Sequence, residues 1–101
     1  MRLMIMFDLP TESSADKRNY RHFRQKLIEE GFLMMQYSLY VKVCPSREAA
    51  KLAEKRISAI SPRLGVVQSL MVTEKQYQSM HFLSGNPSRD TLNSAERTII
   101  I

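Results

Sequence analysis

Short apolar runs alternate with longer amphipathic stretches along this chain. The first run, Leu3–Phe7, is uninterrupted by polar residues and is followed by Asp8 and Pro10. A run this short and this apolar is typical of a strand buried on both faces. Pro10 cannot donate a hydrogen bond to a sheet, so we expect the strand to end there. Asp8 then lies at the carboxyl end of a central strand, either as an ordinary turn residue or as a metal-binding carboxylate.

Two stretches have the periodicity of helices. Hydroxyl residues suited to capping precede the first, which we predict over residues 15–30 with Gly31 as a left-handed cap. Ser46 is the expected N-cap of the second. The apolar stripes that support the two helices are Tyr20, Phe23 and Leu27 in the first, and Ala49, Ala53, Ile57 and Ile60 in the second.

Three further stretches favour strands. Phe32–Cys44 is rich in aromatic and β-branched residues and is either one long bent strand or a hairpin that turns near Gln36–Ser38. Val66–Thr73 alternates between two faces, and Tyr77–Leu83, which is less apolar, is expected at a sheet edge. The order β-α-β-β-α-β, with one or two extra C-terminal strands, predicts an α+β, ferredoxin-like fold.

The composition then changes towards the C-terminal end. A polar loop begins at Ser84, so we expect a ferredoxin-like domain over residues 1–85 and a tail over residues 86–101. The tail closes on the apolar stretch Thr98–Ile101. We expect Ile99–Ile101 to dock as an added or swapped strand on a partner chain.

Charge and cysteine content narrow the function classes. Lys and Arg number 15 against 10 Asp and Glu, which gives a net charge of +5 and suits a polyanionic partner such as nucleic acid. Cys44 is the only cysteine, so the chain has neither an internal disulfide nor a usual zinc site. No apolar segment is long enough to cross a bilayer. We therefore expect a cytoplasmic protein that does not bind membranes.

The catalytic inventory is sparse. The glycines are scattered, which excludes a glycine-rich phosphate loop, and His22 and His81 have no orienting partner in the sequence. Asp8 is the only carboxylate at the end of a buried run, and one carboxylate is a poor Mg²⁺ site. If two chains pair about a twofold axis near this strand end, two copies of Asp8 could hold the ion and polarise a phosphodiester.

The first predicted helix carries a basic group in its first two turns, namely Lys17, Arg18 and Arg21. Cations near a helix N-terminus oppose the helix dipole, which favours a functional role, with a purely solvated face as the alternative. Contacts to phosphates carry no sequence information by themselves. The patch therefore predicts binding to a nucleic-acid backbone without reading of the bases.

Four blocks of the sequence together resemble a known family. Met6–Pro10, Tyr20–Arg24, Gly31–Tyr40 and Val72–Tyr77 are similar to the CRISPR-associated protein two family, the small spacer-acquisition subunit, and most of all to its type II-A version. The resemblance runs from Leu3 to about residue 83. The Asp8 block combined with the block that ends at Tyr40 is its most specific part.

The resemblance implies a ferredoxin-like homodimer in which the Asp8 residues meet and hold Mg²⁺, with endonuclease activity on RNA or double-stranded DNA in some members. It also implies a dimer that bridges CRISPR integrase subunits and carries duplex DNA, with Lys17 and Arg18 on the DNA backbone. Tyr40 takes the place of the second-strand aromatic. The family often has tyrosine before the aspartate, where this chain has Phe7, so the resemblance implies a site with one hydroxyl fewer.

The residue patterns and the family resemblance together leave three functions open, and the integrase complex is implied by the resemblance alone. The first is a scaffold that holds duplex DNA in an integrase complex, and the second is a Mg²⁺-dependent nuclease, of which a toxin-like metal-dependent ribonuclease is a variant. The third is a ferredoxin-like RNA-binding module that stacks bases on its sheet face. The third requires Phe7, Tyr37 and Tyr40 to face solvent together, whereas their apolar neighbours predict that they are buried.

Overall fold

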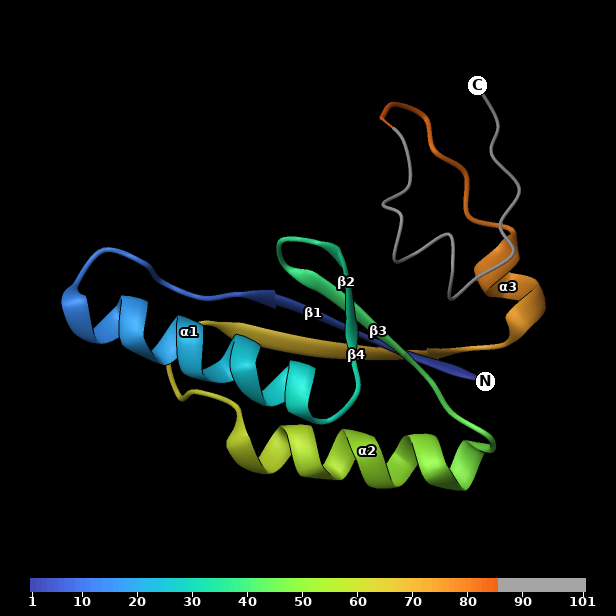
Figure 1. Cartoon of the computed structure of the whole chain (residues 1–101), viewed down its shortest axis with the longest axis horizontal. Helices are drawn as coiled ribbons and strands as arrows, with labels where there is room; N and C mark the ends of the chain where they lie inside the picture. The colour runs from blue at the N-terminus through green and yellow to red at the C-terminus, as the bar shows by residue number, and fades with distance from the viewer. Residues whose placement is uncertain (86–101) are drawn as a thin grey trace.

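The computed structural model describes residues 1–85 and has the predicted order β-α-β-β-α-β, followed by a short helix (Figure 1). A four-stranded antiparallel sheet has the strand order β2-β3-β1-β4. The α+β, ferredoxin-like arrangement is therefore confirmed. The elements are β1 (Arg2–Asp8), α1 (Ser14–Glu29), β2 (Leu33–Gln36), β3 (Leu39–Val43), α2 (Arg47–Ile60), β4 (Val66–Val72) and α3 (Glu74–Gln78).

The central strand β1 divides its side chains between the two faces of the sheet. Leu3, Ile5 and Phe7 belong to the main core, which includes residues of α1 and α2. Their alternates point to the other face, and in register Met4 lies opposite Leu70 and Asp8 opposite Val66 of β4. The strand ends at Asp8, just before Pro10, as predicted.

The two long helices lie on the same side of the sheet (Figure 1). Ser13 caps α1 by accepting from the backbone N–H of Asp16, and Ser46 caps α2 by accepting from the backbone N–H of Ala49. Gly31 follows α1 with φ of +93°, the left-handed conformation expected of a terminating glycine. Both predicted helices are confirmed to within a residue or two of their expected ends.

Residues Phe32–Cys44, predicted as either one long bent strand or a hairpin, form a hairpin. β2 and β3 pair antiparallel through a turn at Tyr37–Ser38, with an irregularity between Met34 and Gln36. Phe7 is the centre of the aromatic core beneath this hairpin, because its ring contacts those of Tyr20, Phe23 and Tyr40 at centroid distances of 5.9, 5.2 and 5.7 Å.

The predicted edge strand at Tyr77–Leu83 is wrong. Residues Glu74–Gln78 form the short helix α3, which Thr73 caps by accepting from the backbone N–H of Gln76 while the Gln76 side chain accepts from the backbone N–H of Thr73. Tyr77, expected on a sheet edge, is instead buried over Met4 and Val41 on the face that α1 and α2 leave open. The expected strand at Thr98–Ile101 lies outside the described residues.

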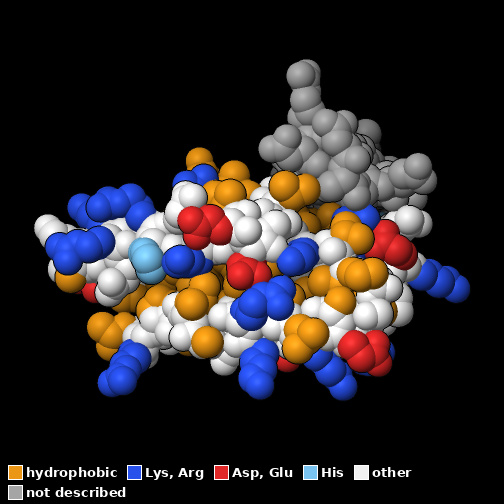
Figure 2. All heavy atoms as spheres, turned by 60° about the horizontal axis from the view of Figure 1, so that its bottom comes forward, with side chains coloured by type: hydrophobic (Ala, Val, Ile, Leu, Met, Phe, Trp, Pro, Cys, Tyr) orange, Lys and Arg blue, Asp and Glu red, His pale blue; other side chains and the backbone are white. Residues whose placement is uncertain are grey.

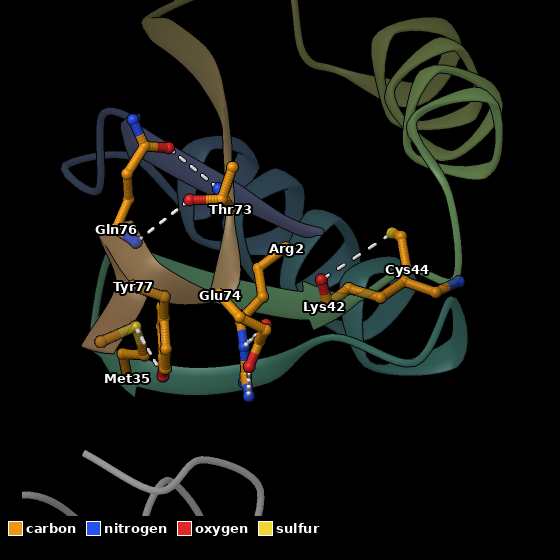
Figure 3. A network of polar contacts seen from close by, with 8 residues as sticks. All are labelled: Arg2, Met35, Lys42, Cys44, Thr73, Glu74, Gln76 and Tyr77. Atoms are coloured by element: carbon orange, nitrogen blue, oxygen red, sulfur yellow. Dashed lines mark hydrogen bonds and ion pairs between the residues drawn. The ribbon is translucent and has the colours of Figure 1, made fainter. Parts of the chain in front are cut away.

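A charged pair fixes α3 to the first strand (Figure 3). Arg2, only 4% exposed, donates to Glu74 through Nε at 2.6 Å and through Nη2 at 2.8 Å. The guanidinium also lies 4.1 Å from the centre of the Tyr77 ring. The hydrogen bond from Arg2 holds the pKa of the Glu74 carboxyl below its usual range. As a result α3 covers the half of the open face nearest the N-terminus.

Two smaller expectations concern burial and membranes. Cys44 is buried, at 2% exposure, as expected of a structural thiol. Among residues 1–85, no helix combines the length and the apolar content needed to span a bilayer.

Candidate functional site

Asp8 lies where the prediction placed it, exposed at the carboxyl end of β1. This end of the sheet is opposite to α3 (Figure 1). The carboxylate belongs to the face that the long helices leave open, because it alternates with Phe7, which points into the core. A hollow of about 180 Å³ adjoins it, lined by Met6, Phe7, Asp8, Ser38, Val66 and Gln68.

The backbone at Asp8 is closely approached by the loop between α2 and β4. Gly65 in this loop has φ of +90°, and a Cβ atom there would lie 2.5 Å from the Asp8 carbonyl oxygen and 3.0 Å from Leu9 Cα. Both atoms are backbone and cannot move aside cheaply. Only glycine therefore lets the loop pass this close to the strand end and bring Val66 opposite Asp8.

Gly65→Ala is expected to destabilise the protein by roughly 2–4 kcal/mol, because a positive φ costs about 1–2 kcal/mol for a residue with Cβ and the backbone clash adds to it. Urea denaturation followed by circular dichroism measures the loss. Gly31→Ala is the matched control, since Gly31 has φ of +93° but its Cβ would meet only the flexible Lys42 side chain at 3.7 Å. Equal losses in the two variants would show that the close approach at Asp8 contributes nothing.

One chain by itself does not make a metal site. Within residues 1–85, no group of three or more His, Cys, Asp or Glu side chains is gathered closely enough to hold an ion. Asp8 is the single carboxylate in its hollow. A hard divalent cation takes several oxygen ligands, so further ligands would have to come from a second chain, water or substrate phosphates.

The uncovered part of the sheet face lies between Asp8 and α3, and we call it the open half. Val66 and Leu70 of β4 are 53% and 51% exposed there. Gln68 separates them, and Met6 and Leu39 are half-buried beside them. Exposed apolar side chains grouped on one sheet face and interrupted by a single polar residue are typical of a protein interaction surface. Asp8 shares this face with them.

The basic patch consists of Lys17, Arg18 and Arg21, all exposed on α1. Their spacing of three and four residues places them on adjoining parts of one helix face. None of the ion pairs within residues 1–85 involves them, whereas Lys26 pairs with Glu29 and Arg56 with Glu30. Figure 2, which brings the side of α2 forward, shows Lys and Arg side chains spread along this side too.

Not every basic residue of α1 is available to a ligand. Arg24 donates through Nε to the Tyr40 hydroxyl at 2.8 Å, which ties the helix to β3.

Tyr40 itself is fully buried, and Phe7 is 5% exposed in the core. A hydroxyl at position 7 would therefore point away from the face of Asp8, so the replacement of tyrosine by Phe7 does not alter the chemistry on that face.

The structure does not support the RNA-binding module that would stack bases on aromatic side chains of the sheet face. It required Phe7, Tyr37 and Tyr40 to be exposed together, but the first and third are buried and only Tyr37 is exposed. The expectation that all three are buried is likewise wrong for Tyr37. The exposure of Tyr37 and the close approach of Gly65 are the features that the sequence did not reveal. His22 and His81 are exposed, as expected.

Comparison with known proteins decides the family. The family model described as CRISPR associated protein Cas2 matches residues 1–80. The chain belongs to the Cas2 family. Two curated proteins named CRISPR-associated endoribonuclease Cas2 match over the full length of both chains, one from Lacticaseibacillus rhamnosus at 59% identity and one from Ligilactobacillus salivarius at 57%.

A solved structure supports the Cas2 fold independently. The crystal structure of Streptococcus pyogenes Cas2 at pH 6.5 superposes with a TM-score of 0.61, covering 83% of this chain and all of that one, at 17% identity. At this identity the likeness concerns the fold alone. Together with the sequence relatives, it makes the chain a CRISPR-associated protein of the Cas2 family with an α+β fold.

Proposed function

We propose that this chain is a CRISPR adaptation subunit that acts as a homodimer, binds the backbone of duplex DNA and bridges copies of the integrase subunit during spacer acquisition. The observation that carries the proposal is the basic patch, three exposed cations without an acidic partner within residues 1–85. Membership of the Cas2 family supports the CRISPR-associated role. The bridging of integrase subunits follows from the family resemblance.

The open half supports dimer formation. Its apolar side chains, Val66 and Leu70 above all, are about half exposed in a single chain, and a second copy laid on the same face would bury them. Because Asp8 lies on this face at one end, a twofold axis near that end would bring two copies of Asp8 together. The proposed docking strand at residues 86–101 would add to the same assembly.

The chemistry of the basic patch fits a phosphate backbone. Lysine and arginine donate hydrogen bonds and positive charge to phosphate oxygens, and such contacts position a duplex without selecting its sequence. Neutralising phosphates releases counterions, so the affinity should fall steeply with salt. A subunit that accepts DNA fragments of any sequence requires this kind of binding.

Replacing Lys17, Arg18 and Arg21 by alanine should weaken duplex binding by roughly tenfold or more at physiological salt. Each lost phosphate contact should also reduce the slope of log affinity against log salt by about 0.9. Fluorescence anisotropy of a labelled duplex over a salt series measures both quantities.

A variant with Arg47, Lys51 and Lys55 replaced by alanine is the matched control. These residues are exposed on α2, and their removal changes the net charge by the same amount. If both variants lost affinity and slope equally, net charge rather than the basic patch would explain binding. An unchanged slope in the first variant would exclude α1 as the contact.

A second candidate function is nuclease activity, which the names of the relatives favour because they are called endoribonucleases. Asp8 suits a Mg²⁺ site in a dimer, since it is an exposed, hard oxygen donor that takes part in no ion pair within residues 1–85. Two copies of Asp8 would supply carboxylate ligands to one ion. The bound ion would polarise a phosphodiester and activate water.

A further inference from the structure

The turn between β2 and β3 carries a large aromatic side chain that the core does not use. Tyr37 is 82% exposed, whereas every other aromatic side chain within residues 1–85 is buried or half-buried. A single exposed apolar residue is ordinary on a protein surface. The residues around Tyr37, however, indicate that this exposed ring binds a ligand.

The backbone beneath the Tyr37 ring is held on two sides. The Tyr20 hydroxyl of α1 donates to the Tyr37 carbonyl oxygen at 3.1 Å, and the Phe7 backbone N–H donates to the Ser38 carbonyl oxygen at 3.1 Å. The Tyr20 and Phe7 rings are themselves in edge contact. The turn is thus fixed to both α1 and β1 while the Tyr37 ring extends into solvent. Because the backbone of the turn is already ordered, little backbone freedom is lost when the ring binds a ligand.

The same turn adjoins the two chemical features already described. Lys17 and Arg21 are separated by one helical turn on the flank of α1 that also carries Arg24, and Arg24 reaches across to Tyr40 of β3. The hydroxyl of Tyr20, three residues after Lys17 and one before Arg21, donates to the Tyr37 carbonyl oxygen, so this part of α1 lies against the hairpin turn. On the other side Ser38, the residue after Tyr37, lines the hollow that contains Asp8.

We propose that Tyr37 is a stacking platform for an unpaired nucleobase, with Lys17 and Arg21 on the phosphates of the same strand. An exposed aromatic ring beside a row of cations is how proteins bind single strands without sequence preference, because every base has a π-face. The inference rests on the proposed nucleic-acid binding and adds the substrate class. The ligand is a nucleic acid with at least one unstacked base, such as a duplex with a single-stranded extension.

The test compares a blunt duplex with the same duplex bearing a short single-stranded extension, both without divalent metal so that no cleavage occurs. Tyr37→Ala should weaken binding of the extended duplex by roughly 5- to 150-fold and leave binding of the blunt duplex unchanged. Tyr37→Phe, which keeps the ring, should bind both like the wild type. Fluorescence anisotropy measures each affinity.

A spectroscopic readout reports the contact directly. The chain has no tryptophan, so Tyr37→Trp introduces a single tryptophan at the platform, which can be excited apart from the tyrosines. Its emission should be quenched when the extended duplex binds and be little changed by the blunt duplex.

The outcomes separate this inference from the proposed function. If the wild type binds both duplexes and Tyr37→Ala affects neither, or weakens both equally, the stacking platform is overturned while backbone binding stands. Binding of neither duplex by the wild type would overturn both. Unquenched emission at position 37 in a saturated complex with the extended duplex would also overturn the platform.

Discussion

Asp8→Asn is expected to slow metal-dependent cleavage strongly while leaving the fold and duplex binding intact. Asparagine keeps the size of the side chain but removes the charge that would attract a divalent cation. Metal catalysis of this kind provides several kcal/mol of transition-state stabilisation, so the rate should fall roughly 100- to 1000-fold. A time course of cleavage of labelled RNA and duplex DNA, with Mg²⁺ or with a chelator, measures the effect.

Glu12→Gln is the matched control for this change. Glu12 is an exposed carboxylate in the loop after β1 that takes part in no ion pair within residues 1–85, and its removal changes the net charge by the same amount. Cleavage at the wild-type rate by Asp8→Asn would assign the activity to another site or to a contaminating nuclease. If the same variant still supports spacer integration, the carboxylate is dispensable for the scaffold role.

The main fold could be predicted because its signals are local. The apolar run before Asp8 forms a central strand, and the stripe through Tyr20, Phe23 and Leu27 is buried as the helical period requires. Ser13 and Ser46 cap the helices that follow them. In each case a few neighbouring residues determine the conformation, and no distant contact opposes them.

The strand predicted at Tyr77–Leu83 was wrong because a helix-start motif in the sequence outweighs the strand propensity of these residues. Thr73 and Gln76 have the spacing of a capping box, which marks a helix start. Tyr77 then packs on Met4 and Val41, and Arg2 pairs with Glu74, across a sequence separation of 72 residues. Contacts this distant are not visible in local periodicity, and they explain why an arginine is buried within the first strand.

The features of the candidate site also divide into those set by local sequence and those set by contacts between distant elements. Asp8 at a strand end and the cations at helical spacing follow from local pattern, and the structure places them accordingly. The role of Gly65 depends on which backbone passes beside it, and the orientation of Phe7 depends on which face the helices cover. Both depend on how distant elements pack together, and so could not be predicted from local sequence pattern.

Leu70→Glu is expected to convert the proposed dimer into a monomer. Leu70 is 51% exposed on the open half, on the same face as Asp8, so a charge there is solvated in a single chain but buried when a second copy covers the face. Burying an unpaired carboxylate on both sides of a twofold interface should raise the dissociation constant by roughly a hundredfold or more. Analytical ultracentrifugation should then report the 11.7 kDa of one chain, whereas we expect twice that mass for the wild type.

The consequences of this change reach both proposed activities. The proposed metal site takes one Asp8 from each chain, so cleavage should be lost, and duplex binding should weaken because the two proposed DNA contacts no longer act together. Leu52→Glu is the matched control, since Leu52 is 59% exposed but lies on α2, away from the open half. It should remain dimeric and active. A Leu70→Glu protein that stays dimeric would show that the chains join through another surface, and cleavage by a proven monomer would show that a single Asp8 is enough.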